Sequence, residues 1–171
     1  MEILILSDSH GYEYGLRQAL ARQVRRPNAV FFLGDGLDDL DVFAGKNLSL
    51  YSVEGNCDWF SITKAPKELI IPFEGHTIFA THGHLYGAKE TDGALIGRAL
   101  EIGADIILFG HTHRPLLQVI PAGSELYSLY TAATCRNERT LYLFNPGSLR
   151  QGSFGTLTLT PENVLFSHGE L

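Results

Sequence analysis

Aspartate, asparagine and histidine side chains, which bind metal ions and move protons, recur in five short motifs along the chain. The motifs are D-x-H, G-D, G-N, H-G-H and G-H-x-H, and they contain Asp8, His10, Asp35, Asn56, His82, His84, His111 and His113. Any one of these residues has an ordinary structural explanation, because an aspartate can cap a helix or stabilise a turn. Their combination in one chain instead favours a shared site for metal ions.

Each motif follows a segment that is predicted to be a buried β-strand. Apolar stretches at 3–6, 29–33, 48–53, 77–81 and 106–109 end just before the five motifs. In open α/β sheets, sites form at the carboxyl edge of the strands because loops from several strands converge there. We therefore expect the five motifs to meet in space.

The alternation of apolar runs and amphipathic stretches predicts an α/β chain. Between the first two strands, apolar residues recur at helical spacing: Leu16, Ala19, Leu20 and Val24. Those two strands should then be parallel and connected in a right-handed manner. A second helix is predicted at 91–102, with Gly103 as its stop signal. Further strands are predicted at 69–73, 116–120, 126–131, 140–144, 155–159 and 164–167.

These elements predict a single domain, 1–171, built from two packed mixed β-sheets flanked by helices. A chain of 171 residues with 44% hydrophobic and 19% charged residues can bury a sizeable core. No apolar run approaches the ~20 residues that a membrane helix needs. Because nucleic-acid affinity depends on cations that displace counterions, a net charge of -6 argues against an extended nucleic-acid surface.

The cysteines and the first residues indicate the compartment. Two cysteines, Cys57 and Cys135, cannot build a disulfide framework, and the chain enters its first apolar segment without a basic leader. We therefore expect a reduced, cytoplasmic protein.

The mixture of Asp, His and Asn donors suits Mn²⁺, Fe or Zn²⁺ better than soft metals. Seven donors are too many for one catalytic ion with an open position, so two ions are the economical interpretation. Two divalent cations ~4 Å apart repel by roughly 16 kcal/mol at an effective dielectric constant of about 20, so an anion must lie between them. Asp35 is the natural candidate, and a shared water, acidified to hydroxide, would be the nucleophile.

In this order the motifs resemble the five sequence blocks of the calcineurin-like metallophosphoesterases. The short length, GNCD at 55–58, THGH at 81–84 and NPGS at 145–148 resemble the small YfcE-type phosphodiesterases in particular, over roughly residues 1–150. The resemblance implies an α/β/β/α sandwich with two metal sites. It assigns one ion to Asp8, His10, Asp35 and His113, and the other to Asp35, Asn56, His82 and His111.

The resemblance also implies an activity. We expect a phosphodiesterase that hydrolyses a small phosphodiester by attack of a metal-bridging hydroxide, with Asp35 and Asn56 taking part in catalysis. Mn²⁺ is the expected ion, with Ni²⁺, Zn²⁺, Fe or Mg²⁺ as alternatives. A phosphomonoesterase or nucleotidase could use the same site. A non-catalytic interaction scaffold, similar to the small retromer subunit that has lost metal ligands, is less favoured because all seven positions here hold competent donors.

Cys57 stands where many larger members of the resembled family have a histidine that contacts the phosphate and assists the leaving group. A nucleophilic cysteine would be redundant beside a metal hydroxide, and Asn56 already supplies the metal donor of this loop. We expect Cys57 to be a small side chain, or a poor proton donor, at the substrate. His84 either donates the proton instead or makes a hydrogen bond within its own loop. Diesters with acidic leaving groups should therefore react best.

Residues 122–139 are expected to form an inserted hairpin relative to the small members of the family, with turn signals at 121–124 and 136–138. Four side chains on it could reach a substrate: Tyr127, Tyr130, Arg136 and Arg139. The favoured interpretation is an extended hairpin either at the free surface or at a subunit contact, and in the second case the protein would be a homo-oligomer.

Overall fold

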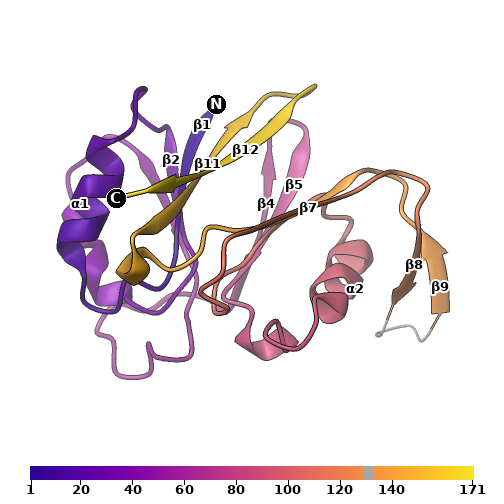
Figure 1. The fold of residues 1–171 in the computed structure, drawn as a ribbon, viewed down its shortest axis with the longest axis horizontal. Helices are drawn as coiled ribbons and strands as arrows, with labels where there is room; N and C mark the ends of the chain where they lie inside the picture. Colours follow the sequence, from indigo (N-terminus) through magenta and orange to yellow (C-terminus); the bar gives the residue numbers. More distant parts are fainter. Residues whose placement is uncertain (129–132) are drawn as a thin grey trace.

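Two five-stranded sheets pack face to face in the computed structural model, which describes residues 1–128 and 133–171 (Figure 1). The first sheet has the order β12-β11-β1-β2-β3 and consists of β1 (Glu2–Leu6), β2 (Ala29–Phe32), β3 (Ser49–Ser52), β11 (Ser153–Leu159) and β12 (Val164–Glu170). Its first three strands along the chain are parallel, and the last two pair antiparallel.

The second sheet has the order β4-β5-β6-β10-β7. It consists of β4 (Glu68–Phe73), β5 (His76–Thr81), β6 (Ile106–Leu108), β7 (Leu116–Ile120) and β10 (Leu141–Asn145). Strands β5, β6 and β10 are parallel, whereas β4 and β7 are antiparallel edge strands. Each sheet therefore contributes a parallel core whose carboxyl ends can carry a site.

The helices lie on the outer faces of the two sheets. They are α1 (Glu13–Ala21), α2 (Gly93–Ile102) and the 3₁₀ helices η1 (Leu37–Phe43), η2 (His84–Tyr86) and η3 (Leu149–Gln151). None of the helices in the described parts of the chain has the length and apolarity of a membrane span.

Strand β1 shows how the sequence produces these layers. Ile3 and Ile5 pack with Phe31 between the two sheets. Because successive side chains point to opposite faces of a strand, Leu4 and Leu6 lie on the other face, where they pack against α1. In the second sheet, β5 and β6 likewise bury one face against α2. The predicted α/β class, with two packed mixed sheets flanked by helices, is confirmed.

Two local expectations are wrong. Val24 was expected on the buried face of the first helix, but α1 ends at Ala21 and the Val24 side chain is fully exposed. The chain has to turn at Pro27 to enter β2, and periodicity does not show where a helix stops. The predicted helix at 91–102 begins two residues late, at Gly93, with Asp92 as its N-cap; the Asp92 carbonyl accepts the Ile96 N–H, and the Thr91 hydroxyl accepts the Gly93 N–H.

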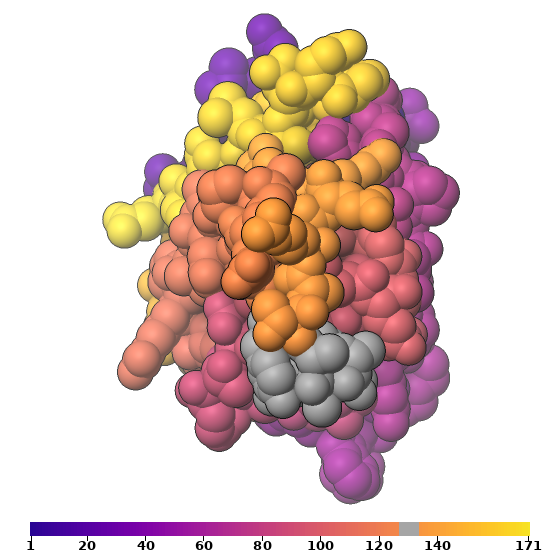
Figure 2. All heavy atoms as spheres, turned by 90° about the vertical axis from the view of Figure 1, so that its right-hand side faces the viewer, coloured from indigo at the N-terminus to yellow at the C-terminus, as the bar shows by residue number. Residues whose placement is uncertain are grey.

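A short hairpin lies outside the two sheets. Strands β8 (Glu125–Ser128) and β9 (Ala133–Arg136) pair antiparallel beside α2 (Figure 1), on the side of the molecule that faces the viewer in Figure 2. Leu126 packs against the cluster under α2. Both strands lie within the hairpin expected at 122–139, and β8 overlaps the strand predicted at 126–131. The side chains of Tyr127 and Tyr130, proposed above as substrate contacts, lie outside those that the structure describes.

Candidate metal centre

All eight candidate side chains lie on loops that leave the carboxyl ends of parallel strands. Asp8 and His10 follow β1, Asp35 follows β2 and Asn56 follows β3, so the first sheet supplies four of them. The second sheet supplies the others, which follow β5 and β6: His82, His84, His111 and His113. The centre therefore lies where the carboxyl edges of the two sheets meet.

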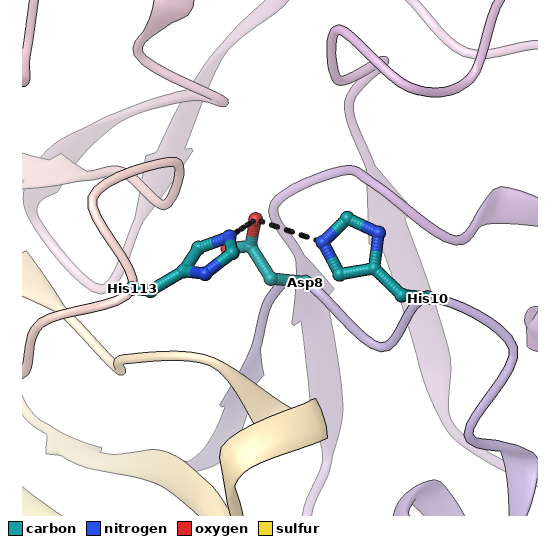
Figure 3. Close-up of side chains that lie close together, drawn as sticks. All are labelled: Asp8, His10 and His113. Atoms are coloured by element: carbon teal, nitrogen blue, oxygen red, sulfur yellow. Dashed lines mark ion pairs between the residues drawn. The ribbon is translucent and has the colours of Figure 1, made fainter.

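A first group consists of Asp8, His10 and His113, whose side chains point toward one another (Figure 3). The Asp8 Oδ1 atom lies 3.0 Å from His113 Nε2 and 3.8 Å from His10 Nε2. Asp8 is completely buried, and its Oδ1 has no hydrogen-bond partner among the described residues. Its Oδ2 accepts from the Ser7 hydroxyl at 2.5 Å and from the His111 N–H at 3.2 Å. A buried carboxylate oxygen without a donor is costly, so this oxygen fits a cation.

Asp35 connects the first group to a second one around His82. Its Oδ2 lies 3.9 Å from His10 Nε2 and 3.4 Å from His82 Nε2. Its Oδ1 accepts the Cys57 N–H at 2.7 Å, which fixes the rotation of the carboxylate. One oxygen of Asp35 therefore faces both groups, as a bridging ligand would.

The His82 ring is oriented by the main chain. Its Nδ1 lies 2.6 Å from the Leu33 carbonyl oxygen, which can only accept, so Nδ1 carries the hydrogen. Its Nε2 is thereby directed toward Asp35 and toward Asn56 Oδ1, which is 3.1 Å away. The Asn56 amide is itself oriented, because its Nδ2 donates to Cys57 Sγ at 3.3 Å. Both groups therefore direct one atom at the centre, Nε2 of His82 and Oδ1 of Asn56.

Protonation states differ across the centre. Burial favours neutral forms of both Asp35 and His82, but their mutual hydrogen bond and attraction outweigh it, so the pKa of Asp35 lies well below its usual range and that of His82 is raised. Burial and the positive charge of His82 lower the pKa of His84, and they lower that of His111 to about 4. His84 and His111 are thus neutral near pH 7, the form in which imidazole binds metals.

His84 lies beside the histidine pair rather than away from it. Its ring centroid is 5.3 Å from that of His82 and 6.1 Å from that of His111, and its Nδ1 is buried without a hydrogen-bond partner among the described residues. The structural alternative for His84, a hydrogen bond from Nδ1 within its own loop, is therefore not made.

The backbone at the centre adopts an uncommon conformation. Five of the seven candidate ligands have φ between 45° and 65°: Asp8, His10, Asp35, His111 and His113. Residues with a Cβ rarely adopt this left-handed region, and each such residue costs on the order of 1–3 kcal/mol. Such strain clusters at functional sites, where the surrounding structure imposes it.

Asp58 holds two of the ligand loops together, a role that sequence reasoning missed. Its Oδ2 accepts the N–H groups of Asp35 and Gly55, each at 2.8 Å. Its Oδ1 accepts the N–H groups of Gly36 at 2.8 Å and Leu37 at 3.0 Å. The contact is so close that a Cβ on Gly55 would lie 2.1 Å from Asp35 Oδ1. The sequence feature that could have indicated this role is the position of Asp58, three residues after Gly55 in a ligand loop.

Other polar residues support the remaining loops. Asp39 Oδ2 accepts from the Ser9 hydroxyl at 2.6 Å and from the Gly11 N–H at 2.9 Å, on both sides of His10. Asn145 Nδ2 donates to the Gly110 carbonyl at 2.7 Å, beside His111. Asp39 was not singled out from the sequence, whereas Asn145 was noted as part of the NPGS stretch at 145–148.

Arg136 and Arg139, proposed above as substrate contacts, contact groups that lie away from the candidate metal centre. Arg136 Nη2 lies 3.2 Å from Glu125 Oε1, within the hairpin. Arg139 Nη1 donates to the Gly75 carbonyl at 3.3 Å, in the turn before β5, at the opposite end of that strand from His82.

Cys57 is exposed, but its thiol is held in the protonated form. Burial of the sulfur and then the neighbouring Asp35 carboxylate raise the pKa of Cys57 to about 11, from an ordinary value of 9.0. The thiolate is the reactive form of cysteine, so a thiol with this pKa is a poor nucleophile at neutral pH in the metal-free protein. The Cys57 Sγ nevertheless lies within 4.8 Å of ligand atoms of His10 and Asp35.

Alkylation of Cys57 should accordingly be slow. At pH 8 the metal-free folded protein is expected to react with iodoacetamide about 100-fold more slowly at this cysteine than the same protein unfolded in urea, because the thiolate fraction is about 100-fold smaller. Mass spectrometry of the peptide that contains Cys57 measures the rate. Equal rates in the folded and unfolded protein would contradict the assignment.

Comparison with known proteins identifies relatives of this chain. The family model described as a calcineurin-like phosphoesterase superfamily domain matches residues 1–164. A Bacillus subtilis protein named "Probable metallophosphoesterase YsnB" is 35% identical over 150 residues, which cover 88% of this chain and 76% of the relative.

Solved structures have the same fold. A novel archaeal phosphodiesterase superposes with a TM-score of 0.72 at 18% identity and covers all of both chains. Wild-type Vps29 from Entamoeba histolytica, complexed with Zn²⁺, superposes with a TM-score of 0.69 at 19% identity and covers 99% of each chain. At these identities the likeness establishes the fold.

Proposed function

The chain belongs to the calcineurin-like phosphoesterase superfamily, as its motifs predicted, and from that premise we propose that it is a binuclear metal-dependent phosphodiesterase. The observation that carries the proposal is the position of Asp35. A single carboxylate oxygen lies 3.9 Å from His10 Nε2 and 3.4 Å from His82 Nε2, so one negative charge is shared by two groups of donors.

The residues present fit two divalent ions. We assign one ion to Asp8, His10, Asp35 and His113, and the other to Asp35, Asn56, His82 and His111. Asp8 Oδ1, which accepts no hydrogen bond among the described residues and lies near His10 and His113, supports the first site. The oriented His82 Nε2 and Asn56 Oδ1 support the second. Mn²⁺ is the ion we favour. Carboxylate, amide and imidazole donors also accept Ni²⁺, Zn²⁺, Fe or Mg²⁺, which are the alternatives. When bound, such ions draw charge from a phosphate and acidify a water.

Cys57 and His84 lie near the centre and could protonate the leaving group. Cys57 offers a thiol that is a weak hydrogen-bond donor. His84, with a buried Nδ1 that has no partner, is the imidazole placed to hand a proton to the departing oxygen, but the pKa of His84 is lowered, so little of it is protonated near pH 7. The geometry thus favours esters whose alcohol leaves without strong acid assistance.

Activity assays with defined metals test the proposal. Metal-stripped full-length protein, resupplied with Mn²⁺, Ni²⁺, Zn²⁺ or Mg²⁺, is expected to hydrolyse an activated aryl diester at least about tenfold faster than the matching aryl monoester, and faster still than an alkyl diester. The sample without added metal is the control and should be inactive. Activity on the monoester alone would favour a phosphomonoesterase or nucleotidase. Equal rates on aryl and alkyl diesters would contradict the leaving-group argument.

The scaffold alternative has less support. The likeness to Vps29 is one of fold, at 19% identity. A scaffold has no need for a buried carboxylate oxygen without a donor or for five strained ligand positions, each of which lowers stability. Both features are accounted for when the centre binds metal.

A further inference from the structure

Three large apolar side chains are exposed to solvent on the loop that follows Asn56. Trp59 is 75% exposed, Phe60 96% and Ile62 93%. In Figure 1 the connection between β3 and β4 extends at the lower end of the molecule, the end to which the carboxyl end of β1 also points. Clustered exposed apolar side chains of this kind mark binding sites more often than isolated ones do.

This aromatic loop, residues 59–62, is held firmly by hydrogen bonds. Asp38 accepts the Ile62 N–H at 3.1 Å and the Thr63 N–H at 2.9 Å. Ser61 donates its N–H to the Asp58 carbonyl at 3.1 Å and its hydroxyl to Asp58 Oδ1 at 3.3 Å. The exposed rings are therefore presented by an ordered backbone, which lowers the entropy lost on binding.

The same bonds tie the loop to the candidate metal centre. The Asp58 carboxylate that accepts from Ser61 also holds the backbone of Asp35, and Asn56 lies three residues before Trp59. The apolar loop therefore follows the candidate ligand Asn56 closely in the chain and is bonded to the same carboxylate that holds Asp35. No such loop is required for the phosphate itself.

A positive charge accompanies the rings. Lys64 Nζ donates to the Trp59 carbonyl at 3.3 Å, so one ammonium group is held at the main chain of this loop. Lys64 interacts electrostatically with Asp38, whose carboxylate oxygens also accept the N–H groups of Ile62 and Thr63. A loop that carries exposed aromatic rings and an ammonium group suits a ligand that combines a planar group with negative charge.

Resting on the proposed phosphodiesterase function, we propose that Trp59 and Phe60 form a subsite for a planar aromatic group, such as a nucleobase, on one ester arm of the substrate. Stacking on aromatic side chains is tolerant of sequence and substituent because every base has a π-face. Two other occupants fit less well. Stable protein interfaces use about 20–30 residues a side, far more than this loop offers, and a chain of net charge -6 is repelled by anionic membranes.

Intrinsic fluorescence gives a direct test, because Trp59 is the only tryptophan of the chain. Adenosine 5'-monophosphate added to the Zn²⁺-loaded protein is expected to quench the emission saturably. Ribose 5-phosphate, which lacks the base, should leave it unchanged. Phe60→Ala should weaken the quenching, and the control Leu165→Ala, an exposed apolar residue on β12, should not.

Kinetics provide the second arm. With a nucleoside p-nitrophenyl diester, Trp59→Ala is expected to raise KM about tenfold more than with methyl p-nitrophenyl phosphate, while kcat changes little. Quenching by the nucleotide without hydrolysis of any diester would support the subsite and contradict the proposed phosphodiesterase function. Equal KM changes for the two diesters together with no quenching would overturn the subsite. The subsite would also be overturned if the protein formed a dimer, or bound to vesicles, and Trp59→Ala abolished that association. Another partner would then cover the loop.

Discussion

Asp35→Asn is expected to reduce turnover at least about 10³-fold and to lower the number of divalent ions bound per chain below two. Two divalent cations ~4 Å apart repel by roughly 16 kcal/mol at an effective dielectric constant of about 20, and the substitution removes the negative charge that offsets this repulsion. The fold should survive, because asparagine has the shape of aspartate.

The orientation of the new amide makes the effect larger. In the native protein Asp35 Oδ1 accepts the Cys57 N–H at 2.7 Å. An asparagine keeps that bond only with its own oxygen in this place, so its NH₂ group takes the position of Oδ2, which faces His10 and His82. The centre would then contain a donor where a shared acceptor is needed.

Calorimetric titration with Mn²⁺ and steady-state assays measure both effects. Asp41→Asn is the matched control, since it makes the same change of charge at an exposed position of η1 and should behave as the unaltered protein. Near-normal activity of Asp35→Asn, with two ions still bound, would rule out a bridging role for this carboxylate.

The strands and their order along the chain were accessible from the sequence because buried parallel strands are short continuous apolar runs. The predicted strand 29–33 differs from β2 by one position, and the predicted strand 106–109 differs from β6 by one position. The meeting of the polar loops followed from the same argument, since parallel strands place their carboxyl ends at one edge.

The parts that were missed depend on contacts between distant segments. The 3₁₀ helix η1 begins at Leu37, whose N–H is held by Asp58 from another loop, and no local pattern announces that bond. Apolar spacing indicated the buried face of α1 through Leu16 and Ala19, but it gave no information about the end of the helix, so Val24 was misplaced.

Backbone conformation at the ligands was also beyond the sequence. Glycine signals a positive φ in advance, as at Gly34 with φ of 94°, whereas an aspartate or histidine does not. That Asp8 and His113 adopt the same region is a consequence of the surrounding hydrogen bonds. The sequence therefore indicated which donors the centre contains, but not the strained loops that aim them.

Asp58→Asn should be the most damaging substitution that leaves every candidate ligand in place. Each carboxylate oxygen of Asp58 accepts two main-chain N–H groups, one pair from Asp35 and Gly55 and the other from Gly36 and Leu37. Whichever way the amide turns, its NH₂ group faces one of these pairs, and two buried donors lose their acceptor.

We expect the free energy of unfolding of the metal-free protein to fall by about 3 kcal/mol, because each buried donor left unsatisfied costs on the order of 1–3 kcal/mol. Turnover should fall by about 10²-fold even where the protein is folded, since a displacement of about 1 Å in a catalytic group has that effect. Urea denaturation and assays at saturating Mn²⁺ measure the two losses separately.

The matched control is Asp38→Asn, because Asp38 also accepts two main-chain N–H groups, those of Ile62 and Thr63, but at the protein surface. Water can replace its acceptor, so the control should lose little stability and keep its metal affinity. If Asp58→Asn lost stability and yet bound Mn²⁺ and turned over like the control, Asp58 would serve the fold alone. If instead turnover and Mn²⁺ affinity fall together at temperatures where the variant is fully folded, the carboxylate positions the ligand loops.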